Sequence, residues 1–485
     1  MDRNLTALKP ALVWKHFAEI VRIPRPSHHE EAIRRYVLDF ARSIGLEASE
    51  DKAHNVLVRK PASKGMENRK GVILQAHLDM VPQKNNDKTF DFLADSIDAY
   101  IDGGWVTADG TTLGADNGIG VAAILAVLED DTLVHGPLEA LFTATEETGM
   151  DGAFGLQPGV LRGEILLNLD SEEEGELYVG CAGGLDANMT LPYSEEPTPV
   201  SGYAAARLTV KGLKGGHSGI QIVCQRANAN KVLFRFLNAA PCELLLCSVD
   251  GGGLRNAIPR EAEAVVLVPE GKYTTFAEAV AAYEKTVQDE FAGIEDGVSI
   301  RVEPCARPER MLPREAAMRL IRAVVGCPDG VQRMSMAMPG LVQTSSNLAR
   351  VVSDGSTVKM QSLLRSSVRS EKFALGEAIT AVFALAGATT ELTGAYDGWN
   401  PDMQSPILKA MTASYEALYG RKPAVTAIHA GLECGIIGGK YPGLDMISFG
   451  PTISYPHSPD EKVEIASVAK FYDFLVHTLR NVPEK

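Results

Sequence analysis

Short apolar runs that end in an acidic residue or a histidine constrain the fold of this chain more than any other feature of its sequence. The runs at 71–76, 140–144 and 164–169 contain few polar residues, as do strands that are buried on both faces of a sheet. Helical patterns at 117–130 and 151–157 separate several of them. Strands that alternate with helices predict an α/β domain with helices on both faces of its sheet. Functional residues gather beyond the carboxyl ends of such strands, so the residues after each run are the first candidates for a site.

The pattern changes in the middle of the chain. A Pro-, Ser- and Glu-rich stretch near 188–200 and a Gly-, Pro- and Asn-rich stretch near 394–406 predict two connections. Between them, strand patterns alternate with fewer and longer helical patterns, which is typical of an α+β module. We therefore predict one α/β domain formed by residues 1–187 and 398–485, interrupted by a module at 188–397 that is long enough to hold two similar lobes.

The charge of the chain limits its partners. The 485 residues include 47 Lys and Arg but 62 Asp and Glu, which gives a formal net charge of −15. Nucleic acids and anionic membranes attract basic surfaces, so we expect neither as a partner. No apolar run is long enough for a membrane span, and the N-terminal segment lacks the apolar stretch of a signal peptide. Seven cysteines without a Cys-x-x-Cys pair indicate neither a disulfide framework nor a thiolate zinc site, so we expect a cytoplasmic protein.

A His-x-Asp motif follows the first apolar run. Alternation along an extended chain puts His77 and Asp79 on the same side. An imidazole in this position can bind a metal while the carboxylate orients it. The alternative is a surface histidine beside a capping aspartate.

Asp116 lies in a glycine-rich segment, residues 111–120, that precedes an apolar helical pattern. Its position before a helix is that of an N-cap, so capping is one interpretation. The crowded glycines favour another, in which the backbone approaches a bound group closely. The spacing differs from that of a dinucleotide-binding loop, so we do not predict one.

Two adjacent carboxylates, Glu146 and Glu147, follow the second run. Adjacent acids near a core repel each other unless a cation lies between or beside them. One could bind a metal while the other acts as a base. A solvated loop is the alternative, although the pair follows the apolar run directly.

Asp170 ends the third run, and His457 lies much later in a proline-rich loop. Each alone is a weak signal. Two imidazoles and three carboxylates, one of them shared, are together the ligands that two divalent ions of the zinc type need. Two such ions about 3.5–4 Å apart lower the pKa of a bridging water and polarise a carbonyl. The spare glutamate of the 146–147 pair could accept the proton of that water and deliver it to a leaving amine.

The motifs that contain these residues resemble those of the di-zinc amidohydrolases, the family that includes carboxypeptidase G, aminoacylase, tripeptidase and carnosinase. The resemblance covers essentially the whole chain. Its motifs are IPRPSHHEE, LQAHLDMV, TTLGADNGIG, EETGMDGAFGL, NLDSEEEG, KGGHSG, HAGLECG and GPTISYPHSPDE. It implies a zinc-peptidase-like catalytic domain with a mixed sheet, interrupted by a large α+β lid domain.

The resemblance also implies roles for the site residues. The metal ligands would be His77, Asp116, Glu147, Asp170 and His457. Asp116 would bridge two ions, one also bound by His77 and Asp170 and the other by Glu147 and His457. Glu146 would be the general base, and Asp79 would hold His77 in its metal-binding tautomer. In this family the peptide bond after the bridging aspartate is often cis.

The inserted module should contribute to the site as well. By resemblance, His217 would stabilise the oxyanion, Asn256 would belong to a lid asparagine motif and Arg365 would hold the substrate carboxylate. His429 and Glu433 would line the substrate pocket. His217 could act within one chain or across a homodimer formed through the lid domain.

The function implied is the metal-dependent hydrolysis of dipeptides with free termini, including Xaa-His dipeptides. Asp170, rather than glutamate, resembles the peptidase members that need a free amino terminus. The expected cofactors are two divalent ions, Zn²⁺ in the first place, with Co²⁺ or Mn²⁺ as substitutes. A tripeptidase or an N-acyl amino-acid deacylase is the alternative, and a binding protein with a decayed site is a more distant one.

Overall fold

The computed structural model describes residues 3–485 and divides into two compact units. Unit 1 comprises Met1–Cys181, Trp399–Ala427 and Leu432–Lys485, and unit 2 comprises Ala182–Gly398 and Ile428–Gly431. The first junction lies before the expected connection near 188–200, because that stretch begins inside strand β9 (Gly183–Pro192) of unit 2. No helix in the described part of the chain is long and apolar enough to cross a membrane.

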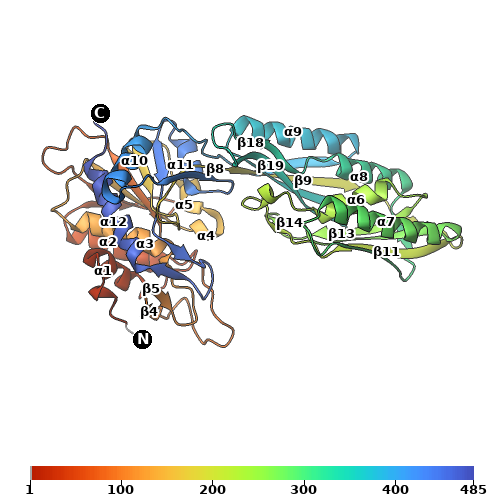
Figure 1. Ribbon diagram of the computed structural model, residues 1–485, viewed down its shortest axis with the longest axis horizontal. Helices are drawn as coiled ribbons and strands as arrows, with labels where there is room; N and C mark the ends of the chain where they lie inside the picture. The colour runs from red at the N-terminus through yellow and green to blue at the C-terminus, as the bar shows by residue number, and fades with distance from the viewer. Residues whose placement is uncertain (1–2) are drawn as a thin grey trace. The chain divides into compact units, whose positions relative to one another are not determined.

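Unit 1 is built on a mixed eight-stranded sheet (Figure 1). The pairs β3–β6, β3–β7 and β7–β23 are parallel, so the carboxyl ends of these four central strands lie at one edge. The pairs β1–β2, β2–β6 and β23–β8 are antiparallel. In spatial order the strands are β1 (Glu47–Glu50), β2 (Val56–Lys60), β6 (Leu138–Thr143), β3 (Val72–His77), β7 (Ile165–Asn168), β23 (Asp445–Ser448), β8 (Glu176–Cys181) and β22 (Ala424–Ile428).

Helices cover this sheet, and the expected helix at 117–130 is the central one. It corresponds to α3 (Ala115–Glu129), which is buried along nearly its whole length and packs against β3 and α1. The pattern at 151–157 corresponds to the short helix α5 (Asp151–Gly155). The other helices of unit 1 are α1 (Ala11–Ile20), α2 (Glu31–Ser43), α4 (Glu146–Gly149), α10 (Pro406–Tyr419), α11 (Glu433–Lys440) and α12 (Ile465–Arg480).

A small second sheet of unit 1 lies beside the start of α3. Its four strands, in the order β24–β25–β5–β4, are antiparallel. They are β24 (Ile453–Ser454), β25 (Lys462–Glu464), β5 (Trp105–Ala108) and β4 (Ala99–Asp102). The hairpin formed by β24 and β25 contains His457 in its loop.

Unit 2 is built on an antiparallel nine-stranded sheet with four long helices packed against it (Figure 1). The strands are β16 (Ser299–Pro304), β11 (Tyr203–Lys211), β15 (Ala262–Pro269), β13 (Leu245–Gly252), β19 (Val342–Ser353), β20 (Thr357–Ser366), β9 and β21 (Thr389–Tyr396), with β18 (Gly330–Met334) paired to β19. The helices are α6 (Ala229–Asn238), α7 (Tyr273–Glu290), α8 (Arg314–Gly326) and α9 (Arg369–Leu385). Apolar side chains of the sheet and of all four helices form one continuous core.

The same topology occurs twice within unit 2. One lobe runs β11–α6–β13–β15–α7–β16, and the other runs β9–α8–β19–β20–α9–β21. If the four strands of each lobe are numbered in chain order, they lie side by side in the sheet in the order 4-1-3-2 in both lobes. The second strands of the two lobes, β13 and β19, pair antiparallel and join the lobes into one sheet. The first lobe is inserted after the first strand of the second lobe.

Lys231 links the helices of the two lobes, and its loss should destabilise unit 2. Its ammonium donates to the carbonyls of Val324, Val325 and Cys327 at the end of α8, at 2.8, 2.8 and 2.7 Å. Lys231→Met would leave these carbonyls without a donor, so we expect a loss of about 1–3 kcal/mol in the free energy of unfolding. Urea titration followed by circular dichroism measures this loss. Lys285→Met is the matched control, because Lys285 is exposed and pairs only with Asp289 on its own helix; an equal effect of both changes would contradict the prediction.

Candidate metal centre

The five residues expected to bind metal come together at the edge of the unit 1 sheet where the parallel strands end. His77 is the last residue of β3, Glu147 follows β6 in α4, and Asp170 follows β7 by two residues. Asp116 is the second residue of α3. His457 reaches the same place from the β24–β25 hairpin.

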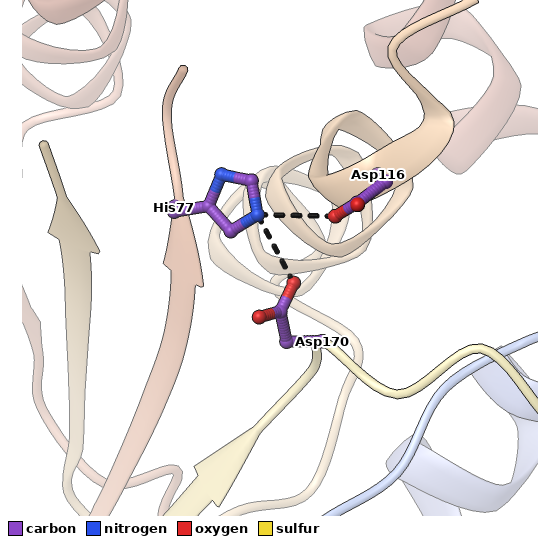
Figure 2. Close-up of side chains that lie close together, drawn as sticks. All are labelled: His77, Asp116 and Asp170. Carbon is purple, nitrogen blue, oxygen red and sulfur yellow. Dashed lines mark hydrogen bonds and ion pairs between the residues drawn. The ribbon is translucent and has the colours of Figure 1, made fainter. Parts of the chain in front are cut away.

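The first group of ligands is centred on His77 (Figure 2). Its Nε2 lies 3.0 Å from Oδ1 of Asp116 and 3.2 Å from Oδ1 of Asp170. The imidazole is 1 % exposed. One nitrogen and two carboxylate oxygens at this spacing surround a position where a cation can bind.

The second group is centred on His457 and shares Asp116. The Nε2 of His457 lies 3.2 Å from Oδ2 of Asp116 and 3.0 Å from Oε2 of Glu147. Asp116 therefore directs one oxygen to each histidine. Hydrogen bonds to Asp116 and then Glu147 raise the pKa of His457 to about 11, so an imidazole here must give up a proton when it binds a metal.

The donor set fits two divalent cations. Burial, together with neighbouring carboxylates, raises the pKa of Glu146, Glu147 and Asp170, because several negative charges are crowded into a site of low polarity. The Oε1 atom of Glu147 is buried without a hydrogen-bond partner among the described residues. Cations relieve this crowding, and imidazole nitrogen with carboxylate oxygen is the ligand combination that zinc accepts.

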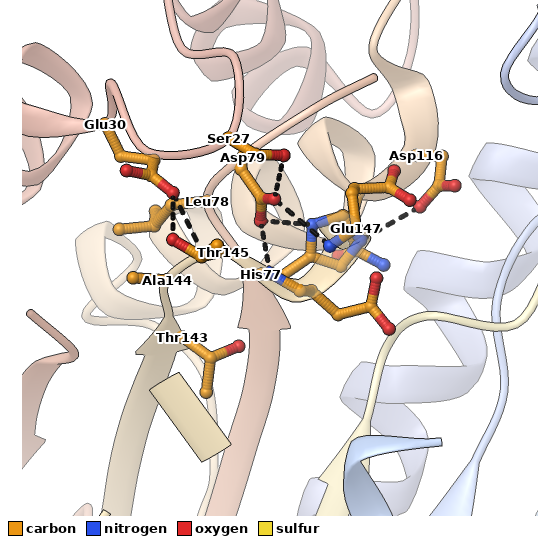
Figure 3. Close-up of polar contacts among 12 residues, drawn as sticks. Ser27, Glu30, His77, Leu78, Asp79, Asp116, Thr143, Ala144, Thr145 and Glu147 are labelled. Atoms are coloured by element: carbon orange, nitrogen blue, oxygen red, sulfur yellow. Dashed lines mark hydrogen bonds and ion pairs between the residues drawn. The ribbon is translucent and has the colours of Figure 1, made fainter. Parts of the chain in front are cut away.

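Asp79 organises the backbone of the two glutamates (Figure 3). Its Oδ1 accepts the N–H of Glu146 at 2.9 Å, and its Oδ2 accepts the N–H of Glu147 at 3.1 Å and the hydroxyl of Ser27 at 2.8 Å. It also lies 3.3 Å from Nδ1 of His77. Burial opposes ionisation, but His77 and these donors lower the pKa of Asp79 to about 2. A charged Asp79 thus orients one histidine and both glutamates.

Glu30 supports the same turn from the other side (Figure 3). Its Oε1 accepts the backbone N–H and the hydroxyl of Thr145, at 2.9 and 2.7 Å. Thr145 has a positive φ of 56°, which β-branched residues rarely adopt. The contact stabilises the unusual backbone conformation immediately before Glu146.

Arg25 and two glycines fix the start of α3. The buried guanidinium of Arg25 donates to the carbonyls of Leu78 and Asp79, at 2.9 and 2.6 Å, and to that of Gly114. A Cβ at Gly114 would lie 2.6 Å from the guanidinium, and one at Gly118 would lie 2.7 Å from it. Gly114 and Gly118 of the glycine-rich segment therefore leave room for the side chain of Arg25.

The peptide bond between Asp116 and Asn117 is cis. The side-chain amide of Asn117 donates to Asp170 and, at 2.9 Å, to the carbonyl of Leu169. Asn117 therefore orients the carboxylate of Asp170.

Glu433, expected in the substrate pocket, lies in a buried polar chain below the strand ends. Its Oε2 accepts from Gln75 at 2.6 Å and from Thr143 at 2.8 Å. Gln75 in turn accepts from Asn168, which accepts from Ser448. The Oε1 of Glu433 is buried without a hydrogen-bond partner among residues 3–485, and burial raises the pKa of this carboxyl to about 7.

The other expected substrate residues belong to unit 2, and three of them meet at Gly219. A Cβ on Gly219 would collide with the carbonyl of His429 and would lie 3.0 Å from the His217 ring and 3.2 Å from Nε of Arg365. Only glycine fits at this position. Asn256 is exposed and lies beside this group, because its carbonyl accepts the N–H of Ser218 at 2.8 Å.

Backbone hydrogen bonds define the tautomer of His217. Its Nδ1 accepts the N–H groups of Gly219 and Ile220, at 3.2 and 3.1 Å. The proton of the neutral ring is therefore on Nε2, which can donate to a ligand. Burial and the charge of Arg365 lower the pKa of His217, which keeps the ring neutral.

Arg365 is a buried cation without an anion. It is 5 % exposed, its Nε atom is buried without a hydrogen-bond partner, and its guanidinium forms no ion pair with any of residues 3–485. Burial and the charge of Arg365 also lower the pKa of the neighbouring His429 to about 3, and Ser345 lies 2.7 Å from that ring. An unpaired buried guanidinium indicates a binding site for an anionic group.

The supporting residues were not predicted from the sequence. Arg25, Ser27, Glu30 and Glu461 each hold backbone or side chains of the centre, and Ser345 contacts His429. Four of them had a visible signal, since Arg25, Ser27 and Glu30 lie in the IPRPSHHEE motif and Glu461 ends the GPTISYPHSPDE motif.

Comparisons with known proteins identify the family of the chain. Residues 73–481 match the model of peptidase family M20/M25/M40. The cytosol non-specific dipeptidase of Escherichia coli (strain K12) is 47% identical over 484 residues, which are 99% of this chain and 100% of that protein. The crystal structure of aminoacylhistidine dipeptidase from Vibrio alginolyticus has a TM-score of 0.95 and 47% identity, covering 99% of each chain.

More distant structures share the fold alone. The aminopeptidase PepT of Bacillus cereus has a TM-score of 0.58 and 16% identity, covering 98% of this chain and 99% of that one. The expected α/β architecture with an α+β insert and the expected family resemblance are confirmed by these matches. The chain is a member of peptidase family M20/M25/M40.

Proposed function

We propose that this chain is a metal-dependent dipeptidase that hydrolyses dipeptides with free amino and carboxyl ends, Xaa-His dipeptides included. The observation that supports it most is the pair of ligand groups that share Asp116, one centred on His77 and the other on His457. The unpaired, buried Arg365 adds a site for a carboxylate. Both relatives that are 47% identical bear names of dipeptidases.

The proposed cofactors are two divalent ions, Zn²⁺ in the first place, held by His77, Asp116 and Asp170 on one side and by Asp116, Glu147 and His457 on the other. Imidazole and carboxylate ligands also accept Co²⁺ or Mn²⁺. When bound, such ions lower the pKa of a water and polarise a peptide carbonyl.

Glu146 is the proposed general base. Its carboxylate shares a group of nearby ligand atoms with His77 and Glu147, and Asp79 fixes its backbone N–H. In this position it takes a proton from the attacking water and passes it to the leaving amine, which lowers the barrier of both steps. Asp79 acts as the residue that orients His77 and the turn at Glu146.

The residues of unit 2 are proposed to bind the substrate. The Nε2–H of neutral His217 donates to the carbonyl oxygen as negative charge develops on it. Arg365 binds the terminal carboxylate with its planar guanidinium. His429 and Asn256 are proposed to line the substrate site beside them, and Glu433 belongs to the hydrogen-bonded network of unit 1.

His217 and Arg365 are proposed to bind one substrate together. The His217 ring and Arg365 both lie next to Gly219 in a single unit 2, although they come from different lobes of that unit. The chain therefore brings these two groups together without a partner subunit. A homodimer through the lid domain stays a further proposal, and the oligomeric state in solution tests it.

A cytoplasmic location belongs to the same proposal. All seven cysteines are free, as expected for a protein of a reducing compartment.

A tripeptidase or an N-acyl amino-acid deacylase is the alternative. Product analysis separates them: the proposal expects cleavage of Ala-His, and it is contradicted by activity that is confined to Gly-Gly-Gly or to N-acetyl amino acids.

Replacing the proposed base should abolish turnover without loss of metal. We expect Glu146→Ala to lower kcat by about 10²–10⁴-fold or more, because the variant lacks the proposed proton acceptor. Dipeptide hydrolysis and the metal content of the purified protein are measured together. Glu173→Ala, which changes an exposed glutamate, is the control and should behave as the wild type. Near-normal activity of Glu146→Ala would exclude this role.

Removing Arg365, the proposed clamp for the terminal carboxylate, should weaken the binding of dipeptides. We expect Arg365→Ala to raise KM for dipeptides by about 10²-fold, since a charge-assisted contact of roughly 1.5–3 kcal/mol is lost. KM for the corresponding dipeptide amides should change much less. Arg350→Ala, an exposed arginine on the neighbouring strand β19, is the control. Equal changes for acids and amides would remove the clamp role.

A further inference from the structure

The hairpin that contains His457 also contains a buried carboxylate that touches the bridging aspartate. Strands β24 and β25 pair through Ile453–Val463 and Ser454–Lys462, and residues 455–461 form the loop between them. We call residues 453–464 the His457 hairpin. Its loop ends in Glu461, which is 2 % exposed.

Both oxygens of Glu461 accept hydrogen bonds from the segment that enters α3. Oε2 accepts the N–H groups of Leu113 and Gly114, at 2.8 and 2.9 Å. Oε1 accepts the N–H of Asp116 itself, at 3.1 Å. One side chain thus satisfies three backbone donors and fixes where Asp116 lies.

Asp116 is held from two directions by two different residues. Arg25 binds the carbonyl of Gly114 together with the carbonyls of Leu78 and Asp79, so it ties the α3 entry to the end of β3, which bears His77. Glu461 ties the same segment to the hairpin that bears His457. Each histidine therefore has its own link to the backbone of the shared ligand.

The hairpin is itself anchored. The hydroxyl of Thr107 donates to the carbonyl of Glu461 at 2.8 Å, and β25 pairs with β5. The ammonium of Lys462 lies 4.7 Å from the ring centre of Trp105 and 5.6 Å from that of Tyr455. These contacts hold the hairpin to its own sheet, and the Glu461 contact links the hairpin to the backbone of Asp116, while His457 contacts the Asp116 side chain.

We propose that Glu461 is a positioning residue that couples Asp116 to His457 and thereby builds the second cation site, the one formed by Asp116, Glu147 and His457. The proposal rests on the two-cation centre of the proposed function. The first cation site, which His77, Asp116 and Asp170 form, depends less on Glu461, because β3 and β7 place His77 and Asp170. Loss of Glu461 should therefore weaken the two cation sites unequally.

Glutamine at position 461 cannot accept all three hydrogen bonds that Glu461 accepts. All three partners of Glu461 are donors, so an amide would direct its own N–H₂ group at a backbone N–H. Glu461→Gln keeps the size of the side chain and removes one of its acceptors. It is therefore the sharpest probe of the coupling.

The test is a titration of the metal-free protein with Zn²⁺ in competition with a chromogenic chelator. For the wild type we expect two ions per chain. For Glu461→Gln we expect one of the two affinities to fall by about 10–100-fold, as for other residues that support metal ligands, while the other stays within a few-fold. Glu464→Gln, on β25 of the same hairpin, is the matched control and should bind as the wild type does.

Melting temperature and circular dichroism of each variant accompany the titration. Wild-type affinity for both ions in Glu461→Gln would overturn the proposal, and so would a parallel loss of both ions with a lowered melting temperature, which marks a structural role only. Should Glu461→Gln not fold, Glu461→Asp is titrated instead, and an equal change at both sites overturns the proposal. A wild type that binds fewer than two ions would contradict the proposed function instead.

Discussion

The carboxylate of Asp116 is the element on which the rest of the centre depends. Its two oxygens lie 3.0 and 3.2 Å from the Nε2 atoms of His77 and His457. In the proposed centre a single side chain sets the separation of two cation sites, and the remaining ligands need only be placed relative to it. Elsewhere in a core, so many carboxylates in one place would be costly. Here the crowding is what gives the site its affinity for divalent cations.

The backbone around this centre is held as firmly as its side chains, because buried side chains bind the backbone N–H and carbonyl groups next to the ligands. Asp79 accepts the N–H groups of Glu146 and Glu147, and Glu461 accepts that of Asp116. Arg25 binds carbonyls on both sides of the centre. Because these supporting groups are buried and charged, each is costly to remove and each constrains more than one ligand.

The sequence was sufficient to predict the α/β fold with its α+β insert, because the apolar runs and the long motifs are local features. The strand that ends at His77 is such a case. The sequence did not predict Glu461 as a support for Asp116, since 345 residues separate the two and only tertiary packing joins them. The expected connection near 188–200 begins inside strand β9 of unit 2. The Pro- and Glu-rich composition near 188–200 made strand β9 difficult to recognise in the sequence, although its alternate residues are buried.

The most direct test of the shared aspartate is anomalous diffraction at the zinc edge from crystals of the zinc-loaded protein. Two peaks are expected, one bonded to His77 and Asp170 and the other to Glu147 and His457, with each oxygen of Asp116 about 2.0–2.2 Å from one of them. A single peak, or two peaks of which neither contacts His457, would contradict the central claim.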